Sequence, residues 1–125
     1  ASSIHLVPIE RNLIDEIWQV DRPFDNDFLA YELKEQWSGE SWQHKVERVR
    51  SLMNESSADA LVVTALDEIA WLLNIRGWDL PNTPVLRAYV ILTNDAIYLY
   101  TDLRKIPRNV AVHLKTDGCF YKNCI

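Results

Sequence analysis

The stretch with the most chemical potential is the four-residue run Arg76, Gly77, Trp78 and Asp79. A cation, a large aromatic ring and a carboxylate at successive positions suit the binding of a polar ligand with charged ends, such as a peptide. A structural interpretation is also open, and the residues alone favour it. Gly77 would then end the preceding helix, Asp79 would accept a hydrogen bond from a loop amide, and Trp78 would cover core.

Histidines and acidic residues form no evident catalytic cluster elsewhere in the sequence. His5, His44 and His113 lie in separate segments without a second ligand at helical spacing, which predicts lone surface or edge histidines. Asp67 and Glu68 are adjacent, so their side chains diverge by about 100° around a helix. We therefore expect Asp67 and Glu68 to stabilise a helix N-terminus and not to act as an acid–base pair. We expect no metal and no cofactor within this chain.

Two further features bear on the cellular environment. The spacing of Cys119 and Cys124 permits a small disulfide loop, which would indicate an oxidising compartment, and it equally permits two free thiols. Without further ligands nearby, the pair is a poor zinc site. Asn54 begins the N-glycosylation sequon Asn54-Glu55-Ser56, which favours a secreted protein only slightly.

Composition limits the classes of protein to which the chain can belong. Its 125 residues are enough for one domain, and 48% hydrophobic with 25% charged residues is typical of a globular protein. A net charge of −5 and a pI of about 5.1 argue against a nucleic-acid partner. The apolar runs are too short to span a bilayer, and no signal peptide is evident. Because the chain lacks an initial Met, we expect a fragment.

The N-terminal region has the pattern of a linker. Leu13, Ile14, Ile17 and Trp18 fit one or two helical turns, and Arg22-Pro23 ends any helix. We therefore interpret residues 1–24 as a linker from a preceding domain, with Trp18 as its anchor.

The first strong helical pattern follows Ser41, a good N-cap. Apolar residues recur at helical spacing from Trp42 to Met53, which predicts an amphipathic surface helix over residues 42–54. Lys45 falls on its polar face, which we expect to be solvated.

The next segment predicts a strand and a second helix. Residues 60–63 are wholly apolar and rich in branched side chains, as expected of a buried, parallel strand. Thr64 and Asp67 form a plausible capping pair for the helix that follows. We expect that helix to end at Gly77.

The C-terminal part predicts β-structure. Residues 85–92 and 96–100 are rich in branched and aromatic types around the polar turn 93–95, which predicts a hairpin. Residues 111–114 could add a strand. The order of elements predicts an α/β domain with a mixed sheet flanked by helices.

Four stretches together resemble one family over nearly the whole chain. The sequence "VVTALDEIAWLLNIRGWDLPNTPV" (62–85) resembles the non-catalytic middle domain of three-domain Xaa-Pro aminopeptidases (aminopeptidase P). "NLIDEIWQVDRP" (12–23) is similar to its entering linker, "WSGESWQHKVERVRSLM" (37–53) to its first helix, and "VLRAYVILTNDAIYLYTD" (85–102) to its hairpin. The terminal "CFYKNCI" resembles secreted or membrane-anchored members. It implies a Cys119–Cys124 bridge and an extracellular or cell-surface location, with the cytoplasm as the alternative.

The resemblance also implies a fold and a parent activity. Residues 25–125 would adopt the creatinase/prolidase N-terminal-like fold. The parent enzyme would remove the N-terminal residue from peptides with proline second. Its two metal ions, usually manganese, would be held by two Asp, one His and two Glu in a catalytic domain outside this chain, so the fragment alone would be inactive. Its partners would be its own catalytic and N-terminal domains, short proline-containing peptides and, in a homodimer, a second copy.

Within that family this domain helps to wall the substrate channel. Carried over residue by residue, the resemblance implies that role for Asn74, Arg76, Gly77 and Asp79. Trp78 stands where the family has smaller residues, which alters the expected shape of the channel. Two rivals stay open: a stand-alone peptide-binding or protein-interaction module, and a pseudo-enzyme whose catalytic domain lacks its ligands.

Overall fold

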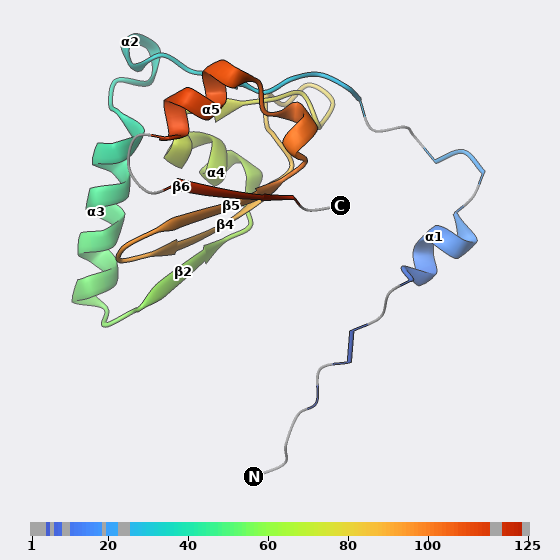
Figure 1. Ribbon diagram of the computed structural model, residues 1–125, viewed down its shortest axis with the longest axis horizontal. Helices are drawn as coiled ribbons and strands as arrows, with labels where there is room; N and C mark the ends of the chain where they lie inside the picture. The colour runs from blue at the N-terminus through green and yellow to red at the C-terminus, as the bar shows by residue number, and fades with distance from the viewer. Residues whose placement is uncertain are drawn as a thin grey trace.

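The computed structural model describes residues 5, 7–8, 11–18, 20–22, 26–115 and, by backbone alone, 119–123. Figure 1 shows the arrangement of the elements. Its helices are α1 (Leu13–Ile17), α2 (Glu35–Ser38), α3 (Trp42–Glu55), α4 (Leu66–Leu73), the 3-10 helix η1 (Leu103–Lys105) and α5 (Arg108–Leu114). Its strands are β1 (Tyr31–Glu32), β2 (Ala60–Val63), β3 (Ile75–Arg76), β4 (Ala88–Thr93), β5 (Ile97–Thr101) and β6 (Cys119–Asn123).

The main sheet has the strand order β2-β4-β5-β6. β2, β4 and β5 are antiparallel neighbours, whereas β6 runs parallel to β5. The sheet is therefore mixed, as the sequence predicted. The predicted hairpin is confirmed by β4 and β5, and its turn is held by Thr93, whose Oγ1 accepts a hydrogen bond from the Ala96 N–H over 3.0 Å. β1 and β3 form a separate antiparallel ribbon, the β1–β3 ribbon.

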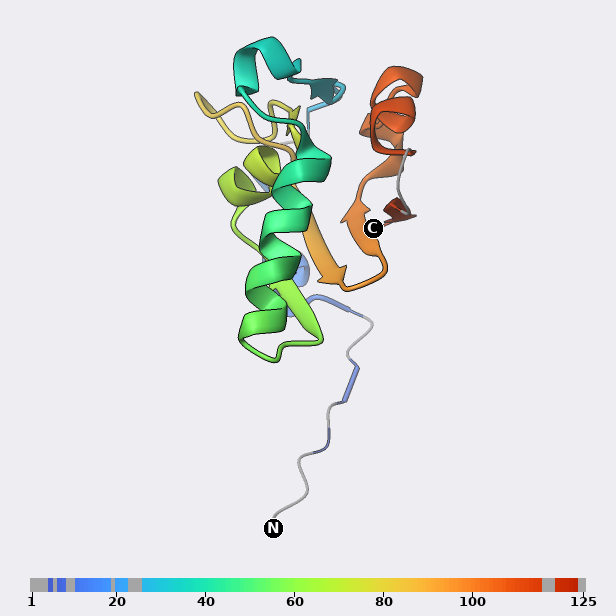
Figure 2. The same ribbon diagram turned by 90° about the vertical axis from the view of Figure 1, so that its left-hand side faces the viewer.

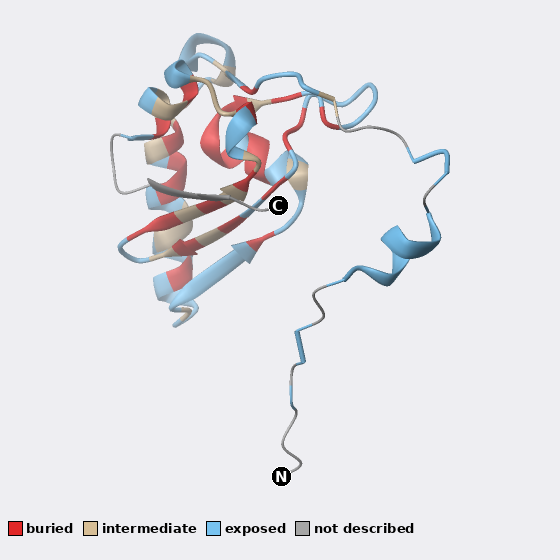
Figure 3. Ribbon diagram, turned by 45° about the vertical axis from the view of Figure 1, so that its right-hand side comes forward, coloured by how far each residue is buried: buried red, intermediate tan, exposed pale blue. Residues whose placement is uncertain are grey.

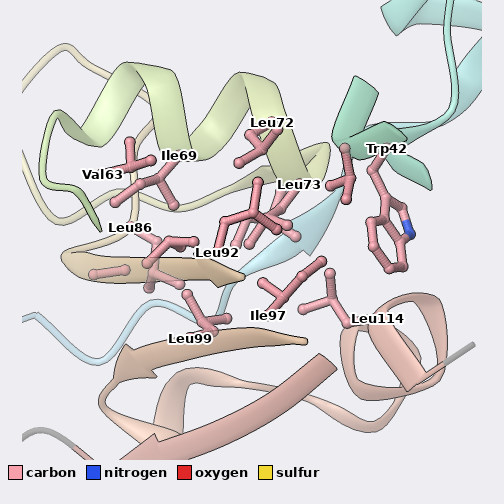
Figure 4. Packing of buried hydrophobic residues seen from close by; sticks show 14 of the residues in the cluster. Trp42, Val63, Ile69, Leu72, Leu73, Leu86, Leu92, Ile97, Leu99 and Leu114 are labelled. Atoms are coloured by element: carbon pink, nitrogen blue, oxygen red, sulfur yellow. The ribbon is translucent and has the colours of Figure 1, made fainter. Parts of the chain in front are cut away.

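One face of the main sheet carries the core. α3 and α4 lie side by side over it (Figures 1 and 2), and α5 contributes Leu114 to the same cluster. Figure 4 shows the packing of these helices against the inward side chains of β4 and β5. The central members of the cluster are Leu73, Val90, Leu92, Ile97, Leu99 and Leu114.

The opposite face, which we call the open face, is different. No described helix packs on it, and Val62 at its edge is 60% exposed. Figure 3 shows the resulting alternation of buried and partly exposed positions along β4 and β5. Its side chains belong to Val62, Tyr89, Ile91, Tyr98 and Tyr100.

Helix α3 confirms the first helical prediction. The Ser41 Oγ accepts a hydrogen bond from the His44 N–H over 3.3 Å, and Trp42, Val46 and Met53 are buried. The predicted solvation of the polar face is wrong at Lys45, which is only 2% exposed. α3 packs against α4 there, so its buried stripe is wider than the apolar residues alone indicate.

The predicted strand at residues 60–63 is confirmed as β2, but its predicted direction and burial are wrong, and the strand predicted at residues 111–114 does not form. β2 is antiparallel to β4 at the edge of the sheet, and only Val63 in it is buried. A wholly apolar run is typical of a strand covered on both faces, but here one face of the sheet is open. Residues 111–114 form the end of helix α5, because Val110 and Leu114 are four residues apart and share one buried face.

The predicted ends of α4 are also wrong. The N-cap is Ala65, which makes no side-chain capping bond, so Thr64 and Asp67 do not act as a capping pair. The helix ends earlier than Gly77, at Asn74, which adopts the left-handed conformation with φ 51°. Asparagine tolerates that conformation better than other residues with a Cβ, which explains the earlier stop.

Helix α1 lies apart from the body (Figure 1). The predicted short helix is confirmed as α1, which has no buried residue. Trp18 is exposed, so it does not act as an anchor within the described residues. Among those residues no helix is both long and apolar enough to cross a membrane.

Candidate functional site

The residues that the sequence singled out lie on β3 and the loop after it, beside α4. Asn74 opens this region and is buried. Its Nδ2 donates to the Ser38 Oγ over 3.1 Å and to the Glu40 carbonyl oxygen over 2.8 Å. Its Oδ1 accepts from the Lys45 Nζ over 2.7 Å. Asn74 therefore joins the end of α4 to the segment that enters α3, and its side chain is fully engaged by the protein.

Lys45 carries a buried charge beneath this region. Its Nζ also donates to the Trp71 carbonyl oxygen over 2.9 Å and lies 4.9 Å from the centroid of the Trp71 ring. Burial lowers the pKa of Lys45, the charge of Glu40 opposes that effect, and Arg76 and Arg48 reinforce it. The ammonium group of Lys45 is thus held by two hydrogen-bond acceptors and an aromatic ring, rather than by an ion pair with a carboxylate.

One nitrogen of the Arg76 guanidinium group, Nη1, has a structural role. Its Nη1 donates to the carbonyl oxygens of Ala70 and Ile75, over 2.5 and 2.9 Å. The Ala70 carbonyl belongs to the last turn of α4, where a cation interacts favourably with the helix dipole. Within the described part of the chain the Nε and Nη2 groups meet no hydrogen-bond acceptor, so Arg76 keeps donors for another group.

Gly77 is required by close backbone packing. A Cβ at this position would lie 3.0 Å from the Val85 carbonyl oxygen and 3.1 Å from the Leu86 Cα. The glycine lets β3 approach the segment that leads into β4. Its predicted role as a helix cap is wrong, because Asn74 occupies that position.

Asp79 is buried and doubly bound. Its Oδ1 forms an ion pair with the Lys105 Nζ, and its Oδ2 accepts from the Arg87 N–H over 2.7 Å. The expectation that Asp79 satisfies a loop amide is confirmed. Its charge is neutralised inside the protein, so the carboxylate is an internal support of the loop.

The surface of this region is aromatic. Trp78 is 46% exposed and Tyr31, paired with Arg76 across the β1–β3 ribbon, is 37% exposed. The Asn26 Nδ2 donates to the Trp78 carbonyl oxygen over 2.5 Å, so residues 26–31 run back beside Trp78. Sequence reasoning missed Tyr31, since nothing in the irregular residues around it indicates a strand that pairs with β3.

His113 also differs from its prediction. It is half-buried rather than a lone surface residue: its Nε2 lies 2.9 Å from the Leu73 carbonyl oxygen and its Nδ1 3.6 Å from the Glu32 Oε1. The ring meets Trp42 edge-on at 6.2 Å between centroids. His113 thus joins α5 to α3, α4 and β1, beside a shallow hollow of about 300 Å³. His5 and His44 are exposed, as predicted.

The described residues contain no group of three or more His, Cys, Asp or Glu side chains able to hold a metal ion. Asn54 is exposed in the last turn of α3. Cys119 begins β6, where only the backbone is described, and Cys124 lies outside the described residues, so their bridge stays a prediction.

Comparison with known proteins shows the family to which this chain belongs. The sequence model of the creatinase/prolidase N-terminal domain matches residues 21–124. The chain is 45% identical to the Xaa-Pro aminopeptidase ApepP of Drosophila melanogaster over 118 residues, which are 94% of this chain and 19% of that protein. It is 39% identical to a probable Xaa-Pro aminopeptidase P of Tuber melanosporum over 87% of this chain and 18% of that protein.

A solved structure agrees with the sequence comparisons. It is that of X-prolyl aminopeptidase from Caenorhabditis elegans, described as a cytosolic enzyme with a di-nuclear active site. The TM-score is 0.85 at 31% identity, over 90% of this chain and 18% of that one. The chain thus spans about a fifth of the length of these relatives. It belongs to the creatinase/prolidase N-terminal domain family, as found in Xaa-Pro aminopeptidases.

Proposed function

We propose that this chain is a non-catalytic domain, in the middle position, of an Xaa-Pro aminopeptidase. The parent enzyme would remove the N-terminal residue from peptides whose second residue is proline. The observation that carries this proposal is the 45% identity to a named Xaa-Pro aminopeptidase over 94% of this chain. Residues 1–24 would then serve as the linker from a preceding domain.

The proposed role of the domain is to wall the substrate channel and to pack on the metal-binding domain. The internal bonds of Asn74, Arg76 and Asp79 support a rigid wall, because each fixes the loop to a neighbouring element. A fixed wall lowers the entropy lost when a peptide is positioned for attack. These residues would act through the shape of the loop, with Gly77 allowing its close packing.

The metal chemistry would belong to another part of the parent. The described residues do not offer a ligand set for a di-nuclear centre. When bound elsewhere in the parent, a pair of metal ions, manganese in our proposal, would activate water and polarise the scissile carbonyl. A homodimeric parent is part of the same proposal.

Kinetics on two forms of the protein test this function. The full-length polypeptide should release the first residue from a Xaa-Pro peptide and lose that activity with a chelator, and manganese should restore it. The 125-residue chain should release nothing. Activity of the isolated chain would overturn the non-catalytic assignment, and an inert, correctly folded full-length protein would favour an interaction module or a pseudo-enzyme.

We further propose an extracellular or cell-surface location, with the cytoplasm as the alternative. The exposure of Asn54 supports it, because an acceptor asparagine must be accessible to be glycosylated. Mass spectrometry of the protein from its natural source is the test. A glycan at Asn54 and a Cys119–Cys124 bridge are expected, and an unmodified Asn54 with free thiols would favour the cytoplasm.

A further inference from the structure

Helix α1 has an apolar side that lies exposed in the described structure. Leu13, Ile14 and Ile17 are between 62% and 86% exposed. They fall within an arc of about 100° around the helix axis. Because α1 has only five residues and none of them is buried, its own backbone bonds do little to stabilise it. An amphipathic helix of this kind is stabilised by packing its apolar side on another surface.

The other side of α1 carries its charges. The Asp15 Oδ1 lies 2.6 Å from the Arg22 Nη1, and the Glu16 Oε1 lies 3.8 Å from the Arg11 Nη1. A contact made through the apolar side would leave both ion pairs in water. Such a contact would therefore bury no charge.

The open face of the main sheet is a surface of matching character. Val62 is 60% exposed and Tyr89 is 55% exposed, and Ile91 is the direct neighbour of Val62 in the sheet. The five side chains that define this face are apolar or tyrosine. A tyrosine ring packs against apolar groups while its hydroxyl group stays at the edge in water. Sheets in layered α/β domains are usually covered by helices on both faces, and the described helices leave this face without its second layer.

The chain between α1 and the body is long enough to bring the two surfaces together. Asn26 is bound to the Trp78 carbonyl oxygen. The next residue, Asp79, accepts a hydrogen bond from the Arg87 N–H, so this anchor lies at the end of the sheet where β4 begins. Tyr89 is two residues further along. The nine residue steps from the end of α1 to Asn26 span up to about 30 Å when extended, whereas the six residues of β4 span about 20 Å.

We propose that α1 is a strap that closes onto the open face of its own domain, with its apolar side covering Val62 and Tyr89. The structure shows the open state, in which α1 lies apart from the body (Figure 1). The occupant is α1 of the same chain rather than of a second copy, because its few side chains are far fewer than the roughly 20–30 residues a side of a standard interface. Within one chain the tether supplies a high effective concentration, so a small contact is sufficient.

Closure fixes the proposed linker, residues 1–24, against this domain. It would thereby limit the motion of any domain that precedes the linker. Both surfaces belong to this chain, so the inference does not depend on the aminopeptidase function. Its test measures accessibility and not turnover, so the two proposals fail separately.

Thiol labelling of the 125-residue chain tests whether α1 covers the open face. The reporters are Val62→Cys and Tyr89→Cys, and the matched control is Val112→Cys, which replaces a valine of 61% exposure on α5. Each is made with native α1 and with Ile17→Asp, which places a charge on the apolar side of the strap. Mass spectrometry of the peptide that contains the new cysteine separates its labelling from that of the two natural cysteines. Thermal unfolding verifies that each variant is folded.

With native α1, Val62→Cys should be labelled about fivefold to tenfold more slowly than in the Ile17→Asp background, because the thiol reacts only while the strap is open. Tyr89→Cys should behave in the same way. Val112→Cys should react equally in both backgrounds. Val7→Asp, a control charge outside α1 at a side chain of 77% exposure, should leave the slow labelling of Val62→Cys unchanged.

Equal labelling of the Val62→Cys thiol with native α1 and with Ile17→Asp would overturn the strap. Labelling that becomes faster on dilution of the protein would assign the cover to a second copy, and it would overturn closure within one chain. An added carboxylate disfavours the thiolate, so faster labelling in the Ile17→Asp background reports exposure and not a more reactive thiol.

Discussion

Lys45 and Asn74 are joined by a hydrogen bond of 2.7 Å that links the first turn of α3 to the residue that ends α4. Both side chains are buried. Asn74 also holds Ser38 and the Glu40 carbonyl oxygen, so one amide fixes three segments. Strand β3, which leads into the loop with Trp78 and Asp79, begins immediately after Asn74. Its position therefore depends on a polar network in the core and on the left-handed backbone of Asn74.

Replacing Asn74 tests the network and the backbone separately. Asn74→Ala removes the amide and places an unfavourable residue at φ 51°, so we expect a loss of about 2–5 kcal/mol in the free energy of unfolding. Asn74→Gly removes the same bonds but tolerates the left-handed backbone, so its loss should be smaller. Chemical denaturation of the three chains measures both. Equal losses would show that the backbone conformation contributes nothing.

The buried charge of Lys45 predicts a pH dependence. Because burial lowers its pKa in the folded chain, the unfolded chain holds more protons between that lowered pKa and the ordinary value of 10.5. The free energy of unfolding should therefore rise with pH across this window. Lys45→Met removes the titration, so the wild type should gain stability relative to the variant as pH increases towards 10.5. A constant difference between the two proteins across that range would contradict the prediction.

Gly77 should be intolerant of any side chain. Gly77→Ala brings a Cβ against the Val85 carbonyl oxygen, and we expect it to cost about 1–3 kcal/mol through overpacking. Gly39→Ala is the matched control, because its Cβ would meet open space and the cost comes only from φ 76°. Asparagine tolerates positive φ, so Gly39→Asn should be milder than Gly39→Ala, whereas Gly77→Asn should be at least as harmful as Gly77→Ala. Thermal unfolding of the four variants checks this order.

The ion pair of Asp79 and Lys105 predicts a strongly non-additive double mutant. Asp79→Leu or Lys105→Met alone leaves a buried charge without its partner and should cost about 3–5 kcal/mol. The double variant removes both charges and should lose much less than the sum of the two single variants. Additive losses in denaturant titrations would mean that the two side chains do not interact. A direct role of Asp79 in substrate binding would instead reduce turnover without reducing stability.

Predictions of secondary structure were confirmed where a local sequence pattern determines it. Ser41 and the apolar spacing after it determine α3, and the polar turn at Thr93–Asp95 determines the hairpin. The predicted mixed sheet is confirmed, but its parallel pair is β5 and β6, and the sequence analysis predicted no strand at the position of β6. The resemblance to Xaa-Pro aminopeptidases led to the same fold, and the comparisons support it.

The predictions that failed concern residues whose burial and partners are determined by tertiary contacts. Residues 60–63 look like a buried strand, but their apolar side chains lie at an edge with one face open. Lys45 looks like a solvated residue, but acceptors from α4 and Asn74 hold it inside. The polar groups of the candidate site are bound to partners many positions away, such as Lys105 for Asp79. No local pattern reveals such pairings, which is why the exposed aromatic surface became visible only in three dimensions.

The open face of the main sheet has a thermodynamic consequence. Val62 and Tyr89 expose apolar surface in the folded chain, and a segment that covered them would bind the folded state but not the unfolded one. Such binding adds to the free energy of unfolding and couples the two parts into one cooperative transition. The stability of this domain is therefore not a fixed property of its 125 residues. It would rise with the binding of any segment or partner that packs against that sheet.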